Sequence, residues 1–266
     1  MLSDGNRINR LENKKMRKSK VVLAVTVVML GMVGTGWAQD EVSVGVTADF
    51  FSKYVWRGQN LVDGAVFEPG VSVGYMGLTG SIWGNLDLTD KNDNSGKFTE
   101  VDYAIDYSGT FPGYEKLGYS VGAIYYDFPN SDASGTTELY AGLSLDVPAS
   151  PAVTVYRDID ECDGMYISLS AGHSIEQISE EVPVGVDLSA SLGWGNKTYN
   201  TFYWGTNGSE LNDLVLSAGF PFEVAGVSVT PQVSFISLLG SDIKNADTYD
   251  TSNSMFVFGV GLAKDF

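Results

Sequence analysis

Side chains that commonly serve in catalysis are scarce in this 266-residue chain, which has one histidine, His173, and one cysteine, Cys162. A serine hydrolase needs a base beside its nucleophile. Ser170 and Ser174 lie at odd spacings from His173, so on a strand they point to the opposite face. A lone cysteine also excludes an internal disulfide and a Cys/His zinc cluster. The sequence therefore predicts no catalytic residues, no cofactor and no metal centre.

Two acidic segments, Asp90 to Gly96 and Asp158 to Gly164, partly resemble calcium loops. Neither has the Gly at position six or the Glu at position twelve that a helix-loop-helix calcium site requires. We interpret both as solvated loops. Loose binding of divalent cations that bridge lipopolysaccharide phosphates is the alternative.

Carboxylates are the chemical groups that recur in a pattern. Around residues 100–107, acids alternate with Val101, Tyr103, Ile105 and Tyr107, which is typical of a strand with one polar and one apolar face. Ionised carboxylates along a narrow aqueous lumen attract cations and repel anions. The candidate pore-lining residues are Asp49, Lys53, Asp87, Glu100, Asp102, Asp106, Glu138 and Asp187.

The elements that carry these residues are strands almost throughout. About twelve alternating runs can be distinguished by the usual strand criteria. They cover 41–56, 65–75, 78–89, 98–110, 117–128, 136–146, 152–158, 165–175, 182–194, 211–220, 224–237 and 254–266. Odd-numbered connections are long and polar, whereas even-numbered ones are mostly short. This rhythm predicts an all-β fold: a transmembrane, antiparallel up-and-down β-barrel of about twelve strands, with both termini on the periplasmic side of a cell outer membrane. Closure also removes the exposed edges of so large a sheet.

The N-terminal segment has the layout of a secretory leader. Basic residues between Lys14 and Lys20 precede the apolar run Val21 to Val33, and small residues at Gly36 and Ala38 suit cleavage before Gln39. We expect residues 1–38 to be a signal peptide, with Met16 as an alternative start, and residues 39–266 to be the barrel. A transmembrane anchor is the alternative, but the run is short for a bilayer.

Removal of that leader leaves a strongly acidic chain. Seven of the 16 basic residues and two of the 33 acids precede residue 39, so 9 Lys and Arg remain against 31 Asp and Glu. Nucleic acid is then excluded as a partner, because phosphate binding needs clustered cations.

The outer face and the C-terminus predict membrane partners. Phe256, Phe258, Val260 and Leu262 alternate towards the terminal Phe266, which resembles the assembly signal of outer-membrane barrels, although Lys264 departs from it. We expect contacts with outer-membrane lipids, lipopolysaccharide and the barrel-assembly machinery. The predicted interfacial aromatic residues are Tyr103, Tyr107, Tyr119, Tyr125 and Trp194. An ordinary final strand of a soluble sheet is the alternative.

One motif resembles a known family. The stretch from Phe51 to Gln59, FSKYVWRGQ, followed by Asp63-Gly64, resembles the opening motif of the TorF family, a conserved hypothetical family of Gcw type whose members are assigned as porins. The resemblance implies an outer-membrane porin of undefined substrate and supplies no catalytic residues. Arg57 is expected to pair with lumen carboxylates and fix the first loop across the mouth, with ligand contact as the alternative role.

Aromatic residues gather in the long loop 195–210. We predict that Tyr199, Tyr203 and Trp204 lie exposed at the mouth of the barrel, either as a platform for a sugar or apolar ligand or as part of the outer girdle. Twelve strands also give an intermediate lumen. Inward aromatic residues would narrow it further: Trp83, Tyr126, Tyr140 and Tyr156.

These observations predict a narrow, cation-preferring channel for small hydrophilic solutes. The alternative is a non-conducting barrel with a surface-binding or envelope-stabilising role, which a fully plugged lumen would favour. The sequence leaves the solute and the oligomeric state open.

Overall fold

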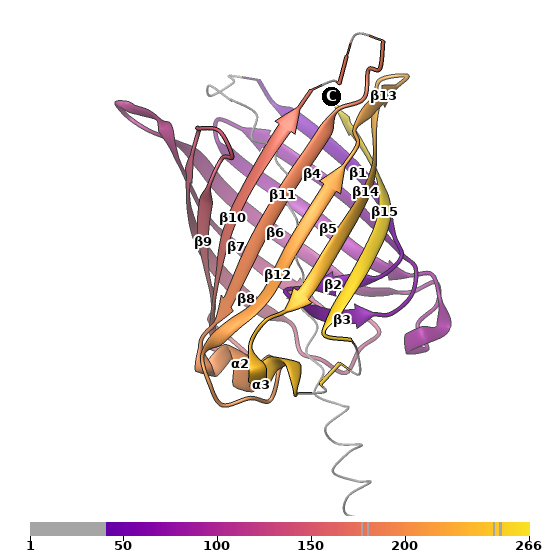
Figure 1. Ribbon diagram of the computed structural model, residues 1–266, viewed down its shortest axis with the longest axis vertical. Helices are drawn as coiled ribbons and strands as arrows, with labels where there is room; N and C mark the ends of the chain where they lie inside the picture. Colours follow the sequence, from indigo (N-terminus) through magenta and orange to yellow (C-terminus); the bar gives the residue numbers. More distant parts are fainter. Residues whose placement is uncertain (1–40, 177, 180, 247, 250–251) are drawn as a thin grey trace, which may run out of the picture.

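The computed structural model describes residues 41–266, apart from residues 177, 180, 247, 250 and 251. Twelve long strands form one closed antiparallel barrel (Figure 1). They are β1 (Ser43–Phe51), β4 (Val66–Tyr75), β5 (Leu78–Asp87), β6 (Phe98–Phe111), β7 (Tyr114–Asp127), β8 (Thr136–Leu145), β9 (Ala152–Asp158), β10 (Met165–Ile175), β11 (Val186–Gly195), β12 (Glu210–Gly219), β14 (Val227–Leu238) and β15 (Ser254–Asp265). The predicted fold class is thereby confirmed. The predicted signal peptide lies outside the described residues.

Each barrel strand pairs with its neighbours in the sequence, and β15 returns to pair with β1. In that closing pair Phe50 lies opposite Val260 and Val46 lies opposite Lys264. The terminal residue takes part in this pairing. The N–H of Phe266 donates to the carbonyl of Val44 over 2.9 Å, and the carbonyl of Phe266 accepts from the N–H of Val44 over 3.3 Å. The apolar C-terminus is thus the seam that closes the sheet.

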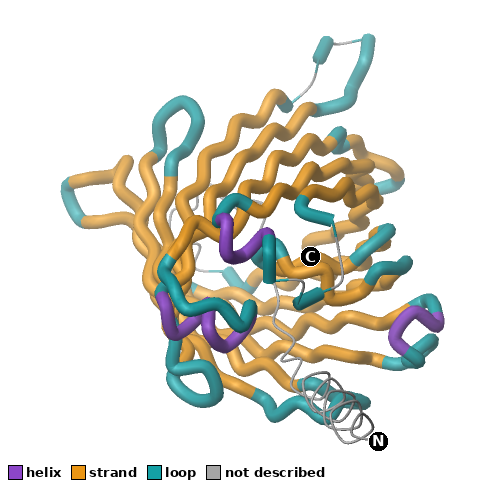
Figure 2. Tube along the Cα trace, turned by 60° about the horizontal axis from the view of Figure 1, so that its bottom comes forward, coloured by secondary structure: helices purple, strands orange, loops and turns teal. Residues whose placement is uncertain are grey.

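The two ends of the barrel differ in their connections. At the end that holds Ser43 and Phe266, called here the terminal end, tight turns such as Met76-Gly77 join the strands, and β13 (Phe222–Val224) widens one of them. The opposite loop end carries η1 (Asp90–Asn92), α2 (Lys197–Tyr203) and α3 (Ser241–Lys244), seen at its rim in Figure 2. In the part of the chain that the structure describes, no helix is long and apolar enough to cross a membrane.

Alternation along the strands separates an apolar outer surface from a polar interior. On β11, Leu188 is 51 % exposed on the outside, whereas Asp187 and Ser189 point inward. On β15, Phe256 and Phe258 are both exposed on the outside, as predicted. The inner face near the terminal end is mostly Ser, Thr and Gly: Thr47, Gly70, Ser72, Thr79, Ser81, Ser120, Thr154, Ser168, Ser189, Ser217, Thr230 and Ser234.

The first loop does not cross outside the barrel but folds into it. β1 ends at Phe51, five residues before the predicted boundary. The chain then forms a small hairpin of β2 (Tyr54–Trp56) and β3 (Gln59–Val62), in which all residues but Val55 are buried. Its two-residue turn has positive φ at Arg57 (46°) and Gly58 (82°), the geometry that matches the twist of a tight hairpin. We call residues 52–65 the plug hairpin.

Candidate functional site: a plugged barrel mouth

The turn of the plug hairpin places Arg57 inside the barrel, 6 % exposed. Its two terminal nitrogens, Nη1 and Nη2, each donate to one carboxylate oxygen of Glu138 on β8 over 2.8 Å. Such a two-bonded guanidinium–carboxylate pair fixes both distance and orientation. Arg57 therefore joins the hairpin to the opposite wall through this pair.

Aromatic rings surround the same guanidinium. Its central carbon lies 4.2 Å from the ring centre of Trp56, 4.3 Å from those of Tyr156 and Tyr166, and 5.8 Å from that of Tyr199. Rings at these distances attract a cation through their negative faces, most strongly where water is excluded. The guanidinium is thus enclosed by one carboxylate and four aromatic rings.

The barrel wall supplies part of this enclosure through its register. Tyr140, Tyr156 and Tyr166 are directly opposite one another on β8, β9 and β10, and all face inward. Their ring centres are 5.7 and 6.3 Å apart along this row. On β7, the hydroxyl of Tyr126 donates to Glu138 over 2.8 Å and holds the carboxylate in place.

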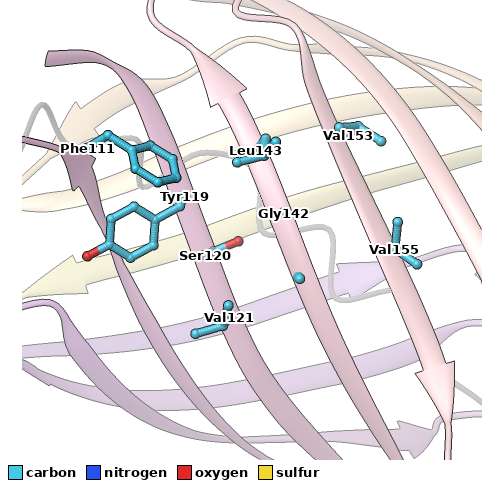
Figure 3. A pocket seen from close by; sticks show the side chains of 9 residues that line it. Phe111, Tyr119, Ser120, Val121, Gly142, Leu143, Val153 and Val155 are labelled. Atoms are coloured by element: carbon cyan, nitrogen blue, oxygen red, sulfur yellow. The ribbon is translucent and has the colours of Figure 1, made fainter. Parts of the chain in front are cut away.

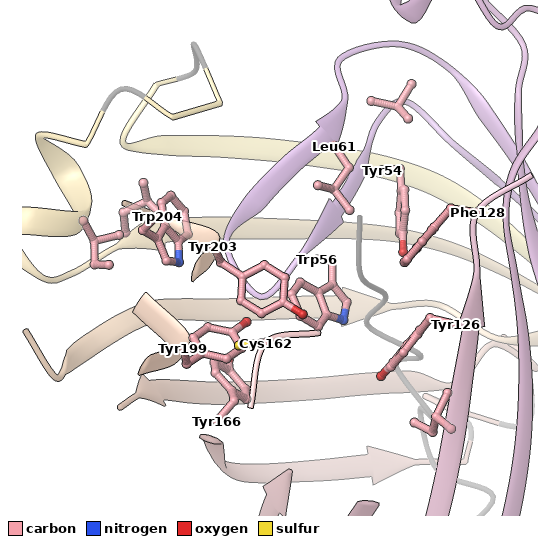
Figure 4. Packing of buried hydrophobic residues seen from close by; sticks show 14 of the residues in the cluster. Tyr54, Trp56, Leu61, Tyr126, Phe128, Cys162, Tyr166, Tyr199, Tyr203 and Trp204 are labelled. Atoms are coloured by element: carbon pink, nitrogen blue, oxygen red, sulfur yellow. The ribbon is translucent and has the colours of Figure 1, made fainter. Parts of the chain in front are cut away.

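Helix α2 closes the enclosure from the loop side, which corrects the prediction for Tyr199, Tyr203 and Trp204. These residues are only 0 to 3 % exposed, so they are neither an exposed ligand platform nor an outer girdle (Figure 4). Tyr199 and Tyr203 pack against Trp56 of the plug hairpin, and Trp204 packs against Tyr249. Ring centres of Trp56 and Tyr203 lie 5.2 Å apart. The helix begins where the side chain of Asn196 accepts from the N–H of Tyr199 over 2.8 Å.

Charge, in addition to packing, keeps the plug hairpin in place. Burial by itself would lower the pKa of Arg57, but the charge and hydrogen bonds of Glu138, together with Tyr199 and Tyr126, raise the pKa well above its usual value. The guanidinium is consequently charged over the whole physiological range. Lys53, at the base of the hairpin, pairs with Asp63 across that base and not with acids of the barrel wall.

The remaining predicted pore-lining acids fall into two groups. Asp87, Glu100, Asp102 and Glu138 are at most 2 % exposed and lie beside or beneath the plug hairpin. The hydroxyl of Tyr54 donates to Glu100 over 3.2 Å. Asp49, Asp106 and Asp187 are only partly buried on the inner face, and Asp106 accepts from the hydroxyl of Tyr140 over 2.7 Å.

Sequence reasoning missed three buried acids. Glu68 faces inward opposite Asp49 on β1, and Asp213 accepts from the hydroxyl of Tyr166 over 2.9 Å. Both are in phase with the polar residues of their strands, so the alternation already contained that information. The third, Asp158, ends β9 and accepts from the hydroxyl of Thr136 over 2.8 Å.

The loop after Asp158 is a hydrogen-bonded turn. Asp158 Oδ1 accepts from the N–H groups of Asp160 (2.9 Å), Cys162 (3.1 Å) and Asp163 (3.3 Å). In the described ranges, no group of three or more His, Cys, Asp and Glu side chains is arranged to hold a metal ion. The same turn buries Cys162 against the aromatic cluster, so this thiol belongs to the packing.

Two features of the outer surface complete the description. His173 is exposed near the terminal end, where it lies opposite Leu188 on the outer face. A groove of about 430 Å³ runs over β6 to β9, lined mainly by outward apolar side chains such as Phe111, Tyr119, Leu143 and Val153 (Figure 3). This surface suits contact with apolar material.

Comparison with known proteins gives no assignment from sequence. No model of a protein family matches the chain, and no curated protein matches it. The resemblance to the TorF family therefore stays a prediction.

Solved structures with a similar arrangement are barrels of low sequence identity. The NanC porin is 12 % identical with a TM-score of 0.49, over 83 % of this chain and 98 % of NanC. An OccD1 (OprD) variant is also 12 % identical, with a TM-score of 0.38 over 84 % of this chain and 65 % of its own. OmpF of Salmonella typhi, in complex with daunomycin, is 9 % identical with a TM-score of 0.38, over 85 % of this chain and 97 % of OmpF. At these values the similarity says nothing about solutes.

Proposed function

We propose that this protein is an outer-membrane barrel of the porin type that passes small hydrophilic solutes, with a preference for cations. The observation that carries the proposal is the contrast between its two surfaces. The outside is apolar and aromatic, which suits lipid, whereas the inside carries Ser, Thr and carboxylates, which suit water. In the described residues, the inner acids greatly outnumber Arg57 and Lys53, and both of these cations are paired.

The same contrast supports a placement in the membrane. We propose that the terminal end faces the periplasm and the longer loops face outward, where they contact lipopolysaccharide, as short turns and long loops are distributed in such barrels. Outward Tyr pairs suit the headgroup level, for example Tyr103 and Tyr125 with ring centres 6.4 Å apart. The exposed Phe256 and Phe258, with Phe266 at the closing seam, support recognition by the barrel-assembly machinery.

In this proposal, the plug hairpin limits the width of the path that a solute takes through the lumen. A solute that enters from the terminal end meets a Ser- and Thr-lined vestibule with Asp49, Asp106 and Asp187, and then the buried cluster around Arg57. Passage of the solute depends on how far the plug hairpin moves out of its path. A second candidate, a non-conducting barrel with a binding or envelope-stabilising role, is favoured by one observation: Trp56, Gln59 and Val62 of the hairpin are 0 % exposed.

Planar-bilayer recording distinguishes these two functions. The chain from Gln39 onward is refolded and inserted, and currents are measured under a KCl gradient. We expect steady conductance with a reversal potential on the cation side. Replacing Asp49, Asp106 and Asp187 together by Asn should shift that potential towards zero, because these acids face the vestibule. Reproducible insertion without current would reject the channel and leave the second candidate.

A further inference from the structure

The enclosure around Arg57 has the composition of a binding site for an organic cation. Its fixed parts are Glu138 on β8, Tyr156 on β9, Tyr166 on β10 and Tyr199 on α2, which we call the cation cage. None of the four belongs to the plug hairpin. If the hairpin left the lumen, Arg57 and Trp56 would leave with it, and the cage would remain on the barrel wall and α2.

The contacts of Arg57 with the cation cage are ones that a free guanidinium could make in its place. Glu138 presents both carboxylate oxygens at 2.8 Å. Tyr156 and Tyr166 each present a ring whose centre is 4.3 Å from the guanidinium carbon. Aromatic faces offer little to a strongly hydrated metal cation, whereas a flat, weakly hydrated guanidinium uses both the rings and the fork of the carboxylate.

Support from neighbouring side chains keeps the cage formed independently of Arg57. Tyr126 donates to Glu138 over 2.8 Å, and Tyr166 donates to Asp213 over 2.9 Å. Tyr199 packs against Tyr166 with ring centres 5.3 Å apart. These contacts join barrel wall to barrel wall or to α2, so loss of the arginine leaves them in place.

We propose that the cation cage is a binding site for the guanidinium or alkylammonium group of a small organic cation, and that Arg57 is a built-in ligand that occupies it while the hairpin is inserted. This proposal rests on the proposed function, because it names the class of solute that would compete with the plug hairpin for the cation cage. A solute of this class would displace Arg57 by replacing its contacts. Neutral solutes lack that ability.

Binding of methylguanidinium to the refolded barrel in detergent tests the proposal without any measurement of current. Arg57→Ala vacates the cage. Arg157→Ala is the matched control, because Arg157 on β9 forms an exposed pair with Asp163 of the following loop. By calorimetric titration we expect saturable binding to Arg57→Ala at least about tenfold tighter than to the wild type or to Arg157→Ala, as expected when a few cation–ring and charged contacts are regained. The double variant Arg57→Ala/Glu138→Gln should lose this binding.

Methylurea provides the probe control, because it has a similar flat shape without the charge. Equal binding of methylurea and methylguanidinium, or no difference between Arg57→Ala and Arg157→Ala, would overturn the proposal. If Arg57→Ala refolds poorly, folding itself becomes the readout: methylguanidinium in the refolding buffer should restore the compact, heat-modifiable band, and methylurea should not. Failure of that rescue would also count against the cage. A barrel that binds methylguanidinium but carries no current would reject the channel and keep the cage.

Discussion

The buried charge of Arg57 organises the mouth of this barrel. The guanidinium of Arg57 makes two hydrogen bonds to Glu138. Its central carbon also lies 4.2 to 5.8 Å from the ring centres of four aromatic residues. Taking an ion pair out of water is costly, so the pair need not make the barrel more stable than an apolar core would. What the pair does supply is position, because two parallel hydrogen bonds fix both the distance and the orientation of the guanidinium.

Replacing Glu138 by a neutral residue should therefore reveal the free-energy cost of burying the charge of Arg57. In Glu138→Gln the guanidinium of Arg57 stays buried without its counter-charge, and we expect a loss of about 3 kcal/mol in the free energy of unfolding. Asp163→Asn, at the exposed pair with Arg157, should change it by less than about 1 kcal/mol. Urea titration of both variants in lipid vesicles provides the comparison. Equal losses of unfolding free energy in Glu138→Gln and Asp163→Asn would show that Arg57 is not held by Glu138.

The thiol of Cys162 reports on the same cluster from the loop side. Burial raises its pKa from 9.0 to about 12, with a further contribution from Asp158. Thiolate is the reactive form, so at pH 8 we expect very slow labelling by iodoacetamide in the folded barrel and fast labelling after unfolding. The rate in the folded state should rise only as the pH approaches 12.

An exposed thiol in the same end of the barrel serves as the labelling control. Ser134→Cys in a Cys162→Ala background places a thiol at an exposed loop position, where labelling should be fast without unfolding. Fast labelling of Cys162 in the native chain would mean that the loop after Asp158 does not stay packed on the cluster.

At the scale of elements, the barrel strands could be predicted from alternation, but the plug hairpin could not. Tyr54 and Trp56 continue the alternation of β1 in sequence, so the expected first strand extended to residue 56. A period of two shows that side chains point to opposite faces and does not show that a strand has left the barrel wall. Helix α2 was missed for a related reason: its seven residues are too few to display a helical period, although Tyr199 and Tyr203 have the spacing of four that places them on one face.

The role of Arg57 was nevertheless accessible from composition. Cations are rare in residues 39–266, and a motif that places one among carboxylates predicts pairing. The partner was not accessible, because Glu138 lies 81 residues away and is brought to Arg57 only by closure of the sheet. For the same reason the burial of Tyr199, Tyr203 and Trp204 could not be deduced: exposure of a loop residue depends on what the lumen already contains.

The turn of the plug hairpin allows the packing of this element to be measured. A Cβ on Gly58 would lie 2.8 Å from Leu238 Cδ2 and 3.0 Å from Asp213 Cβ, and φ is +82°. Gly58→Ala should therefore lose about 1 kcal/mol for the backbone and a further 1–3 kcal/mol for the clash. At Gly226 in the turn before β14, φ is +74° and no atom lies within 4 Å, so Gly226→Ala should show the backbone cost alone. Equal unfolding free energies for the two variants would place the turn away from the wall.

For the whole molecule, the decisive property is that apolar residues lie outside and polar residues inside, the reverse of a soluble domain. Adjacent residues of β11 test this directly. Ala190 faces outward between Ala171 and Leu216, whereas Ser189 faces inward between Gly172 and Ser217. An arginine on the lipid face near the middle of a bilayer costs about 2–4 kcal/mol, while the lumen can hydrate it.

Ala190→Arg should thus lower the free energy of unfolding in lipid vesicles by about 2–4 kcal/mol, and Ser189→Arg by less than about 1 kcal/mol. The inward arginine also meets the acids of the vestibule, so the same Ser189→Arg barrel should show a weaker cation preference in bilayer recordings. The comparison therefore uses two adjacent residues of the same strand. A larger loss for Ser189→Arg than for Ala190→Arg would mean that the chain packs its Ser- and Thr-rich face against other protein, and the assignment of outer surface and lumen would have to be exchanged.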